Sequence, residues 1–367
     1  MALRSNAKRR LETRLLVKNN GGVYGVTYRW GGSLTNAALV PDAGLDEAFT
    51  IDDGGGILRT QIWHYPSRTE CLVCHSAPAG YALGFNTSQM NRGFDYGSGL
   101  TNQIGALSLA GYFSAKVTGL HTLPALAAAT NSAVSLEYRV RSYLAANCVQ
   151  CHQPGGSAFA AWDARLSTAT PQAGIINGPL VATSGVTNRF VVAPGSLSNS
   201  VMFTRLANLG PDHMPPLATS LVNTQALALL GAWITNDLPS YQTFPDWQLA
   251  HFGSTNAPNA APTADPDGDR ANNYLEYVTG TDPLDPASYW QISVQSTSNS
   301  IQILYPQLAN RGFEVQAASN LSPPAPWVPL DLPGNEPFFS VSNRAGVLSD
   351  PAAGLTNRFY RVRVFTP

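Results

Sequence analysis

The chain has 367 residues, enough for two or three domains that each have a hydrophobic core. Charged residues make up 12% of the chain, where an average soluble domain has about 25%, and the net charge is -1 without a basic stripe. This composition argues against a nucleic-acid partner, and no run of 18 apolar residues is present to form a transmembrane segment.

Residues 1–66 carry the pattern of β-strands. Leu11 to Lys18 predicts a strand, Asn19 to Gly22 a turn, and Val23 to Trp30 the returning strand. Ile57 to His64 predicts a further strand. We expect this region to be part of a β-sandwich that is truncated at its N-terminus.

Two Cys-x-x-Cys-His pentads follow, and together they contain every cysteine of the chain. Two thiols at this spacing can add to the two vinyl groups of one haem, while the adjacent imidazole binds the iron. The pentads therefore predict two covalent haem c groups. The thioether positions would be Cys71, Cys74, Cys148 and Cys151, and the proximal iron ligands would be His75 and His152.

The same cysteines have two other possible uses. A Cys-x-x-Cys pair can act as a redox dithiol, and two such pairs can share a structural zinc ion. Neither use requires a histidine directly after the second cysteine. Because both pentads of a chain with only six histidines place one there, the pattern favours haem.

The distal ligand of the first haem has three candidates. Met90 follows the first pentad at a short distance and is our first choice, with His121 and His64 as rivals. An open distal position is the remaining alternative. We assign the first haem to about residues 67–134.

The second haem, in about residues 135–242, has a better specified surrounding. Ser135 can cap a helix that leads into the second pentad, and Asn223 can cap a later helix, which is the arrangement of a small class I cytochrome c. Between them, Met214 precedes two prolines and offers a soft thioether to the iron, so we predict it as the distal ligand. His213 is its competitor, whereas Met202 has the pattern of a core residue.

Residues 243–289 contain a Pro/Ala/Asn-rich stretch, Ser254 to Ala264, which predicts a linker, and then an acidic loop. The loop has oxygen-bearing residues at the spacing of a Ca²⁺ loop, although Arg270 stands where that loop usually has glycine. The alternative is a solvated acidic turn at a helix start. The candidate Ca²⁺ ligands are Asp265, Asp267, Asp269, Asn273 and Glu276, with Asp282 or Asp285 as further oxygen donors.

Residues 290–367 alternate apolar and polar residues in short runs separated by Asn, Gly, Pro and Ser, which predicts a small β-sandwich. The predicted strands are Ile292 to Val294, Ile301 to Tyr305, Phe313 to Ala317, Phe338 to Val341 and Phe359 to Val364. The predicted fold class is therefore multidomain, with a mainly α cytochrome c-like haem region over residues 67–242 flanked by β-sandwich regions at both termini.

Residues 8 to about 238 resemble the dihaem cytochrome portion of large exported proteins of planctomycete- and verrucomicrobia-type bacteria. The resemblance lies in Arg9 to Arg14, Tyr65 to Arg68, Arg141 to Leu144 and Met214 to Pro216. In that family such a region often follows a sugar-dehydrogenase-like β-propeller, which this chain does not contain. Residues 244–290 look like a calcium-binding segment found near the C-termini of such proteins.

The function expected from these patterns is one-electron transfer, as the haem module of a larger exported dehydrogenase system. Its partners would be a quinoprotein-like dehydrogenase and a terminal electron acceptor. One alternative is a dihaem peroxidase or oxidase with an open first haem, and another is a calcium-stabilised surface or adhesion protein. We expect a periplasmic or secreted location, and because four basic residues but no apolar signal segment precede the first hairpin, an N-terminally truncated chain or a miscalled start.

Overall fold

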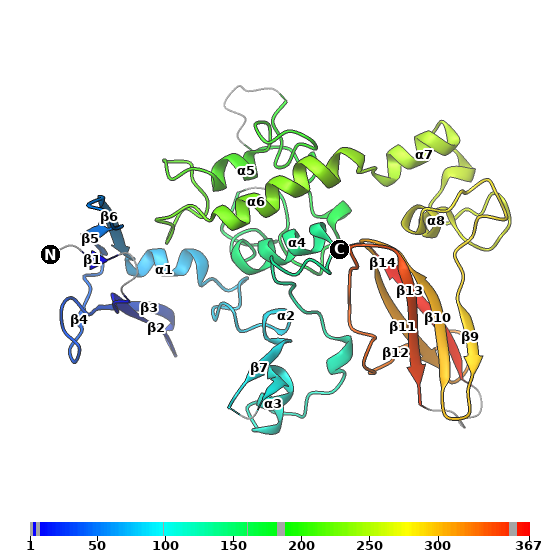
Figure 1. The fold of residues 1–367 in the computed structure, drawn as a ribbon, viewed down its shortest axis with the longest axis horizontal. Coiled ribbons are helices and arrows are strands. Elements are labelled where there is room, and N and C mark those ends of the chain that lie inside the picture. The colour runs from blue at the N-terminus through cyan, green and yellow to red at the C-terminus, as the bar shows by residue number, and fades with distance from the viewer. Residues whose placement is uncertain (1–2, 5–7, 98, 160, 182–187, 352–357) are drawn as a thin grey trace.

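The computed structural model describes residues 3–4, 8–97, 99–159, 161–181, 188–351 and 358–367. The N-terminal strands lie at one end of an elongated arrangement, the pentad-bearing helices in the middle, and the C-terminal strands at the other end (Figure 1). Within the described residues, no helix is both long enough and apolar enough to span a bilayer.

The predicted fold class, a mainly α haem region between β-sandwich regions, is wrong. Only 22% of the chain is helical and 24% is strand, and the strands are divided among several small sheets. In the described part of residues 148–200, the only helix is the three-residue η2 (Thr170–Gln172). Glycines and prolines recur throughout this stretch. They interrupt helices because glycine raises the conformational-entropy cost of forming a helix and proline lacks the backbone N–H donor.

The N-terminal strands form two three-stranded sheets. The predicted hairpin is confirmed, since β2 (Glu12–Asn19) pairs antiparallel with β3 (Gly22–Arg29), and the short β4 (Ala38–Leu39) extends this sheet. The other sheet has the order β1 (Leu3–Arg4), β5 (Leu45–Asp52) and β6 (Leu58–Tyr65). An ion pair joins the sheets, with Arg29 Nε donating to Glu47 Oε2 at 2.7 Å.

The first pentad lies at the end of α1 (Arg68–Cys74). Ser67 starts this helix with a capping box, in which its hydroxyl accepts from the Glu70 amide and the Glu70 carboxylate accepts from the Ser67 amide. The chain then forms a series of short elements. These are α2 (Thr87–Met90), β7 (Gly93–Asp95), β8 (Leu100–Asn102), α3 (Gln103–Leu109) and η1 (Leu120–Thr122).

The second pentad follows α4 (Leu136–Asn147), which Ser135 caps as predicted. The predicted Asn223 cap is also confirmed, at the start of α6 (Thr224–Ala232). Two further turns, the π-helical η3 (Trp233–Asp237) and η4 (Leu238–Ser240), continue from α6, and α5 (Val201–Leu206) packs beside it. The core that these elements share includes Val140, Leu144, Ile175, Trp233 and Ile234.

The acidic loop lies between α7 (Phe244–Phe252) and α8 (Asn273–Thr279). The stretch before it, for which composition predicts a linker, is instead packed and contains η5 (Pro258–Ala260). Ala260 is fully buried, and its carbonyl oxygen accepts from Gln248 Nε2 at 2.6 Å. Ala260 therefore anchors this stretch to α7.

The C-terminal strands form two three-stranded sheets around a common core. One sheet has the order β13 (Arg344–Asp350), β10 (Ile301–Gln307), β9 (Ser293–Ser296), and the other has β12 (Val328–Pro329), β11 (Gly312–Ala318), β14 (Phe359–Phe365). The predicted strand over residues 338–341 belongs to neither sheet. Instead, Ser340 bridges to Val134 and the Phe339 ring stacks on Tyr138 of α4 at 4.2 Å, which fastens these sheets to the second pentad region.

Candidate functional site

Helix α4 delivers the second pentad directly from the central core. Cys148 is the C-cap of α4, where its amide donates to Leu144 O at 2.8 Å, and the His152 amide donates to Cys148 O at 2.8 Å. Cys148 packs against the core cluster, and burial raises the pKa of its thiol to about 12. The pentad therefore forms one compact turn with both thiols and the imidazole on a fixed backbone.

This turn opens into a cavity of about 520 Å³, within the ~300–1,000 Å³ range of cofactor and ligand sites. The cavity brings together the second pentad and Met214, which are far apart in the chain. Among the described residues that line it, Arg205 is the only charged one. The lining groups with metal-binding or thioether-forming chemistry are Cys74, Cys148, Cys151, His152, Met202 and Met214.

His152 is held by an aromatic ring that the sequence pattern does not reveal. Its imidazole stacks on Trp162 with ring centroids 4.0 Å apart. Burial, followed by the positive charge of Arg205, lowers the pKa of His152 to about 4, so the imidazole is neutral at pH 7. The neutral ring is the form that binds metal, and its Nδ1 is buried without a hydrogen-bond partner among the described residues.

Met214 reaches the cavity from the loop before α6. Its amide donates to Arg205 O at 3.0 Å, which ties this loop to α5. Met202 also lines the cavity but is 8% exposed and belongs to the core cluster. His213, the predicted competitor, is absent from the described lining residues and places its Nδ1 2.7 Å from Gly210 O.

The first pentad has sparser surroundings. Cys71 faces the sheet, where a Cβ on Gly25 of β3 would come within 2.6 Å of its Sγ, so only glycine leaves room for this thiol. His75 Nδ1 lies 2.6 Å from Tyr81 O, and donation to this carbonyl would leave Nε2 free to bind metal. Tyr81 adopts a left-handed backbone conformation with φ 62°.

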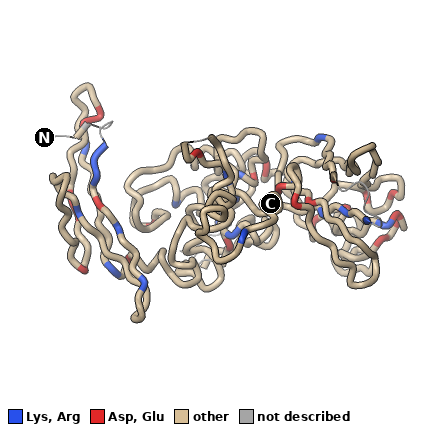
Figure 2. Tube along the Cα trace, turned by 90° about the horizontal axis from the view of Figure 1, so that it is seen from below, with Lys and Arg blue, Asp and Glu red and all other residues tan. Residues whose placement is uncertain are grey.

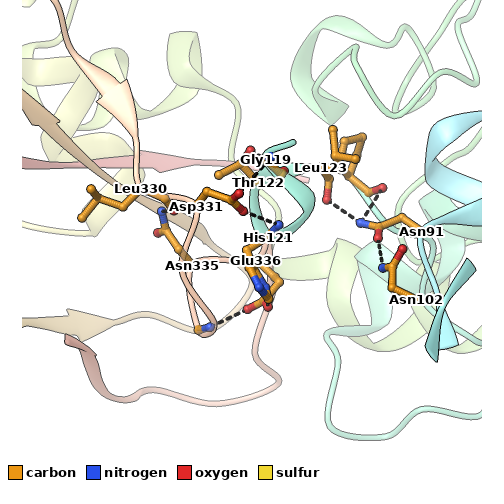
Figure 3. A network of polar contacts seen from close by, with 12 residues as sticks. Asn91, Asn102, Gly119, His121, Thr122, Leu123, Leu330, Asp331, Asn335 and Glu336 are labelled. Atoms are coloured by element: carbon orange, nitrogen blue, oxygen red, sulfur yellow. Dashed lines mark hydrogen bonds and ion pairs between the residues drawn. The ribbon is translucent and has the colours of Figure 1, made fainter. Parts of the chain in front are cut away.

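Two of the candidate distal ligands for the first haem are held in ion pairs. His64 lies between two carboxylates, 3.0 Å from Glu70 and 2.6 Å from Asp46, and these contacts raise its pKa. His121 Nδ1 lies 2.5 Å from the Glu336 carboxylate of the C-terminal region, as Figure 3 shows. Met90 carries no such contact and is buried at the end of α2.

The two pentads meet. Cys74 of the first pentad lines the cavity of the second, and the Val73 carbonyl accepts from Ser157 Oγ at 2.9 Å. Cys151 Sγ lies 3.8 Å from the same carbonyl. Interaction between the neighbouring thiols of Cys74 and Cys151 lowers the pKa of Cys151 to about 6 and raises the pKa of Cys74.

The acidic loop gathers carboxylate oxygens. Some accept from backbone amides of the loop, and others have no hydrogen-bond partner among the described residues. One carboxylate oxygen from each of Asp265, Asp267 and Asp269 lies within 4.8 Å of the others. Glu276 is fully buried, and neither of its oxygens has a hydrogen-bond partner in the described part of the chain. Burial first, and then the charges of the three aspartates and Asp282, raise the pKa of Glu276 to about 7.

The remaining members of the predicted loop also fit a cation. The Oδ1 atom of Asn273 is buried without a partner among the described residues, while its amide nitrogen donates to Asn259 O and Ala261 O, both at 2.8 Å. Arg270 adopts φ 80°, the left-handed conformation that glycine supplies at this position of a Ca²⁺ loop. A bound cation would neutralise the carboxylates and supply the partner that these oxygens lack.

No family model, curated protein or solved structure matches the chain. The site therefore has to be interpreted from its own residues. Sequence reasoning missed three of them, Trp162, Arg205 and Ser157, because their contacts depend on loop conformation rather than on spacing. An aromatic residue shortly after the second pentad is the one signal that could have indicated Trp162.

Proposed function

We propose that this chain is a dihaem c-type cytochrome that transfers single electrons. The observation that supports this function best is the cavity that unites Cys148, Cys151 and His152 with Met214. The donor set, two thiols, a neutral imidazole and a thioether around an apolar space, matches the requirements of a covalently attached haem with both axial positions filled. When bound, the haem would supply one-electron redox chemistry.

The chain's own residues have distinct tasks in this function. The cysteines anchor the group, Trp162 keeps the His152 ring in one orientation, and the contact between Met214 and Arg205 O fixes the distal loop. Arg205, which lines the cavity, would pair with an acidic group of the cofactor. The apolar lining limits access of water, which raises the reduction potential of a His/Met centre further.

The proposed partners are a quinoprotein-like dehydrogenase as donor and a terminal electron acceptor, in the periplasm or outside the cell. This part of the proposal rests on the family resemblance and on the surface. Between Cys71 and Leu136 the only charged residues are Arg92, Asp95 and Lys116, and Figure 2 shows long uncharged stretches through the middle of the molecule. Docking on such a surface would depend only weakly on ionic strength.

The experiment is production of the chain in an export-competent host that has haem-attachment machinery. We expect the intact mass to rise by two haem groups, and the oxidised protein to show the weak red absorption band of methionine-to-iron ligation. The Cys148→Ser/Cys151→Ser variant, made in the same way, should gain one haem and lose the part of this band that Met214 contributes. An unmodified polypeptide mass, or a protein that contains only zinc, would refute the proposal.

A second candidate function is a dihaem peroxidase or oxidase. The observation that favours it is the engagement of His64 and His121 by carboxylates, which leaves Met90 as the remaining candidate distal ligand at the first site. An open first iron would show a high-spin spectrum and bind cyanide or peroxide. Absence of both signals in the oxidised dihaem protein would exclude this function.

We also propose that the acidic loop binds Ca²⁺ as a structural ion. The support is the combination of three clustered aspartates with the buried, unpartnered Glu276. Calorimetric titration of the chelator-treated chain with Ca²⁺ should show one site. The Glu276→Gln variant should bind much more weakly, because it loses one carboxylate oxygen and its negative charge.

A further inference from the structure

The four cysteines lie in different surroundings, and one cysteine of each pentad lies close to the other pentad. Cys71 faces Gly25 of the N-terminal sheet, and Cys148 packs into the central core at the end of α4. Cys74 and Cys151 both line the shared cavity, where their thiols are neighbours. The backbone next to Cys74 also contacts the second pentad region, since Val73 O accepts from Ser157 Oγ at 2.9 Å and lies 3.8 Å from Cys151 Sγ.

We propose that, before haem is attached, Cys74 and Cys151 form a disulfide that joins the two pentads. The oxidant is a small-molecule or protein disulfide, such as oxidised glutathione. One cysteine thiolate attacks it, forms a mixed disulfide and releases one glutathione, and the other cysteine then attacks the protein-bound sulfur and releases the second. Both cysteine protons end on the two glutathione thiols, so atoms and electrons balance.

This bond would control haem loading at both pentads together, a consequence that rests on the proposed function. Haem attachment needs both thiols of a pentad, and the disulfide removes one thiol from each. A single reduction step would restore both sites. The chain would therefore be loaded twice or not at all, according to the thiol redox state of its compartment.

The test uses the whole chain produced without haem and equilibrated in a glutathione redox buffer. After free thiols are alkylated, peptide mapping by mass spectrometry identifies the linked cysteines. We expect the Cys74–Cys151 link to predominate in the folded protein, and the Cys71→Ser/Cys148→Ser variant to retain it. In high urea the links should shift to neighbouring cysteines, because closing a short loop costs less entropy in an unfolded chain. Links within the pentads that predominate without urea would overturn the proposal.

A second arm tests the control of loading. The oxidised chain is incubated with haem and attachment machinery, with and without prior treatment by a thiol reductant. We expect two haems after reduction and none before it, and a haem on either pentad of the cross-linked chain would overturn the control. If the reduced chain also takes up no haem, the proposed cytochrome function fails, while the peptide map still decides whether the cross-link exists.

Discussion

The two pentads have the same five-residue pattern but very different surroundings. The second pentad follows a 12-residue helix and lines a cavity together with a tryptophan that stacks on its histidine and a methionine. The first ends a seven-residue helix against a small sheet, where its histidine is oriented by one backbone carbonyl. The pattern therefore indicates where a haem could be attached, whereas the fold around it determines which distal ligand is within reach.

The largest difference is expected when each pentad loses its thiols. Cys71→Ser/Cys74→Ser should leave one haem and keep the red absorption band of Met214 ligation, because the central core is built without the first pentad. Cys148→Ser/Cys151→Ser should remove the Met214 contribution to that band and leave a single haem at the first site. Intact mass and visible spectra measure both. If the two variants give the same spectrum, the sites are not different in the way the structure indicates.

The second largest expected effect comes from replacing the candidate distal methionines, because each replacement should change the spectrum and potential of one haem. Met214→Ala should remove the second haem's contribution to the red band and lower the potential of that haem, since a thioether ligand favours the reduced iron. Met90→Ala is the matched change at the first site, and it should alter the other haem if Met90 is its ligand. Potentiometric titration of both variants measures this. If the reduction potentials are unchanged in Met214→Ala, Met214 is not an iron ligand.

The residues that contact the two histidines, Trp162 and Tyr81, should contribute unequally to the free energy of unfolding. Trp162 is 8% exposed and stacks on His152, so Trp162→Ala should lower the free energy of unfolding by about 3 kcal/mol. At the first site the His75 imidazole is bonded to the Tyr81 backbone carbonyl, which any residue supplies. Because asparagine suits the positive φ at this position, the effect of Tyr81→Asn should stay below ~1 kcal/mol. Urea denaturation measures both. A cost for Tyr81→Asn equal to that for Trp162→Ala would contradict the comparison.

Local signals in the sequence predicted much of the secondary structure and little of the way it is assembled. Ser135 and Asn223 were predictable caps because a side-chain oxygen bonded to a nearby amide is a short-range feature. The mainly α haem region was wrong because residues 148–200 are held by non-local bridges such as that between Ile176 and Val192. Such contacts leave no period in the sequence.

The candidate site divides in the same way. The pentads and the acidic loop have fixed spacing, so their residues could be named from the sequence. The contact between Cys74 and Cys151, and the stacking of Trp162 on His152, depend on how distant segments fold together. The ion pairs of His64 and His121 involve partners from other elements, and neither could be anticipated from the neighbouring residues.

The smallest expected effect concerns the acidic loop, which is attached to the second site's side of the molecule. Tyr277 of α8 donates to Gln242 O at 2.8 Å, just beyond the helical turns that continue α6. Chelation of Ca²⁺ should therefore destabilise the central region and leave the N-terminal sheets unchanged. Saturation at 100 times the dissociation constant corresponds to about 2.7 kcal/mol. Hydrogen exchange with and without chelator locates the effect, and equal protection losses in both regions would contradict it.

The folding stability of the metal-free chain should also change with pH, in a direction that the pKa of Glu276 determines. In the metal-free chain the pKa of Glu276 is raised from its ordinary value of 4.5 to about 7, so the folded state binds more protons than the unfolded state between these values. Without Ca²⁺, the contribution of Glu276 to folding stability should therefore be largest below pH 4.5 and should decrease as the pH rises to 7. Ca²⁺ should remove this fall, because the cation stabilises the ionised carboxylate. Glu276→Gln should show no such fall in chelator and only weak stabilisation by Ca²⁺, and a fall of unchanged size in that variant would assign the titration to another group.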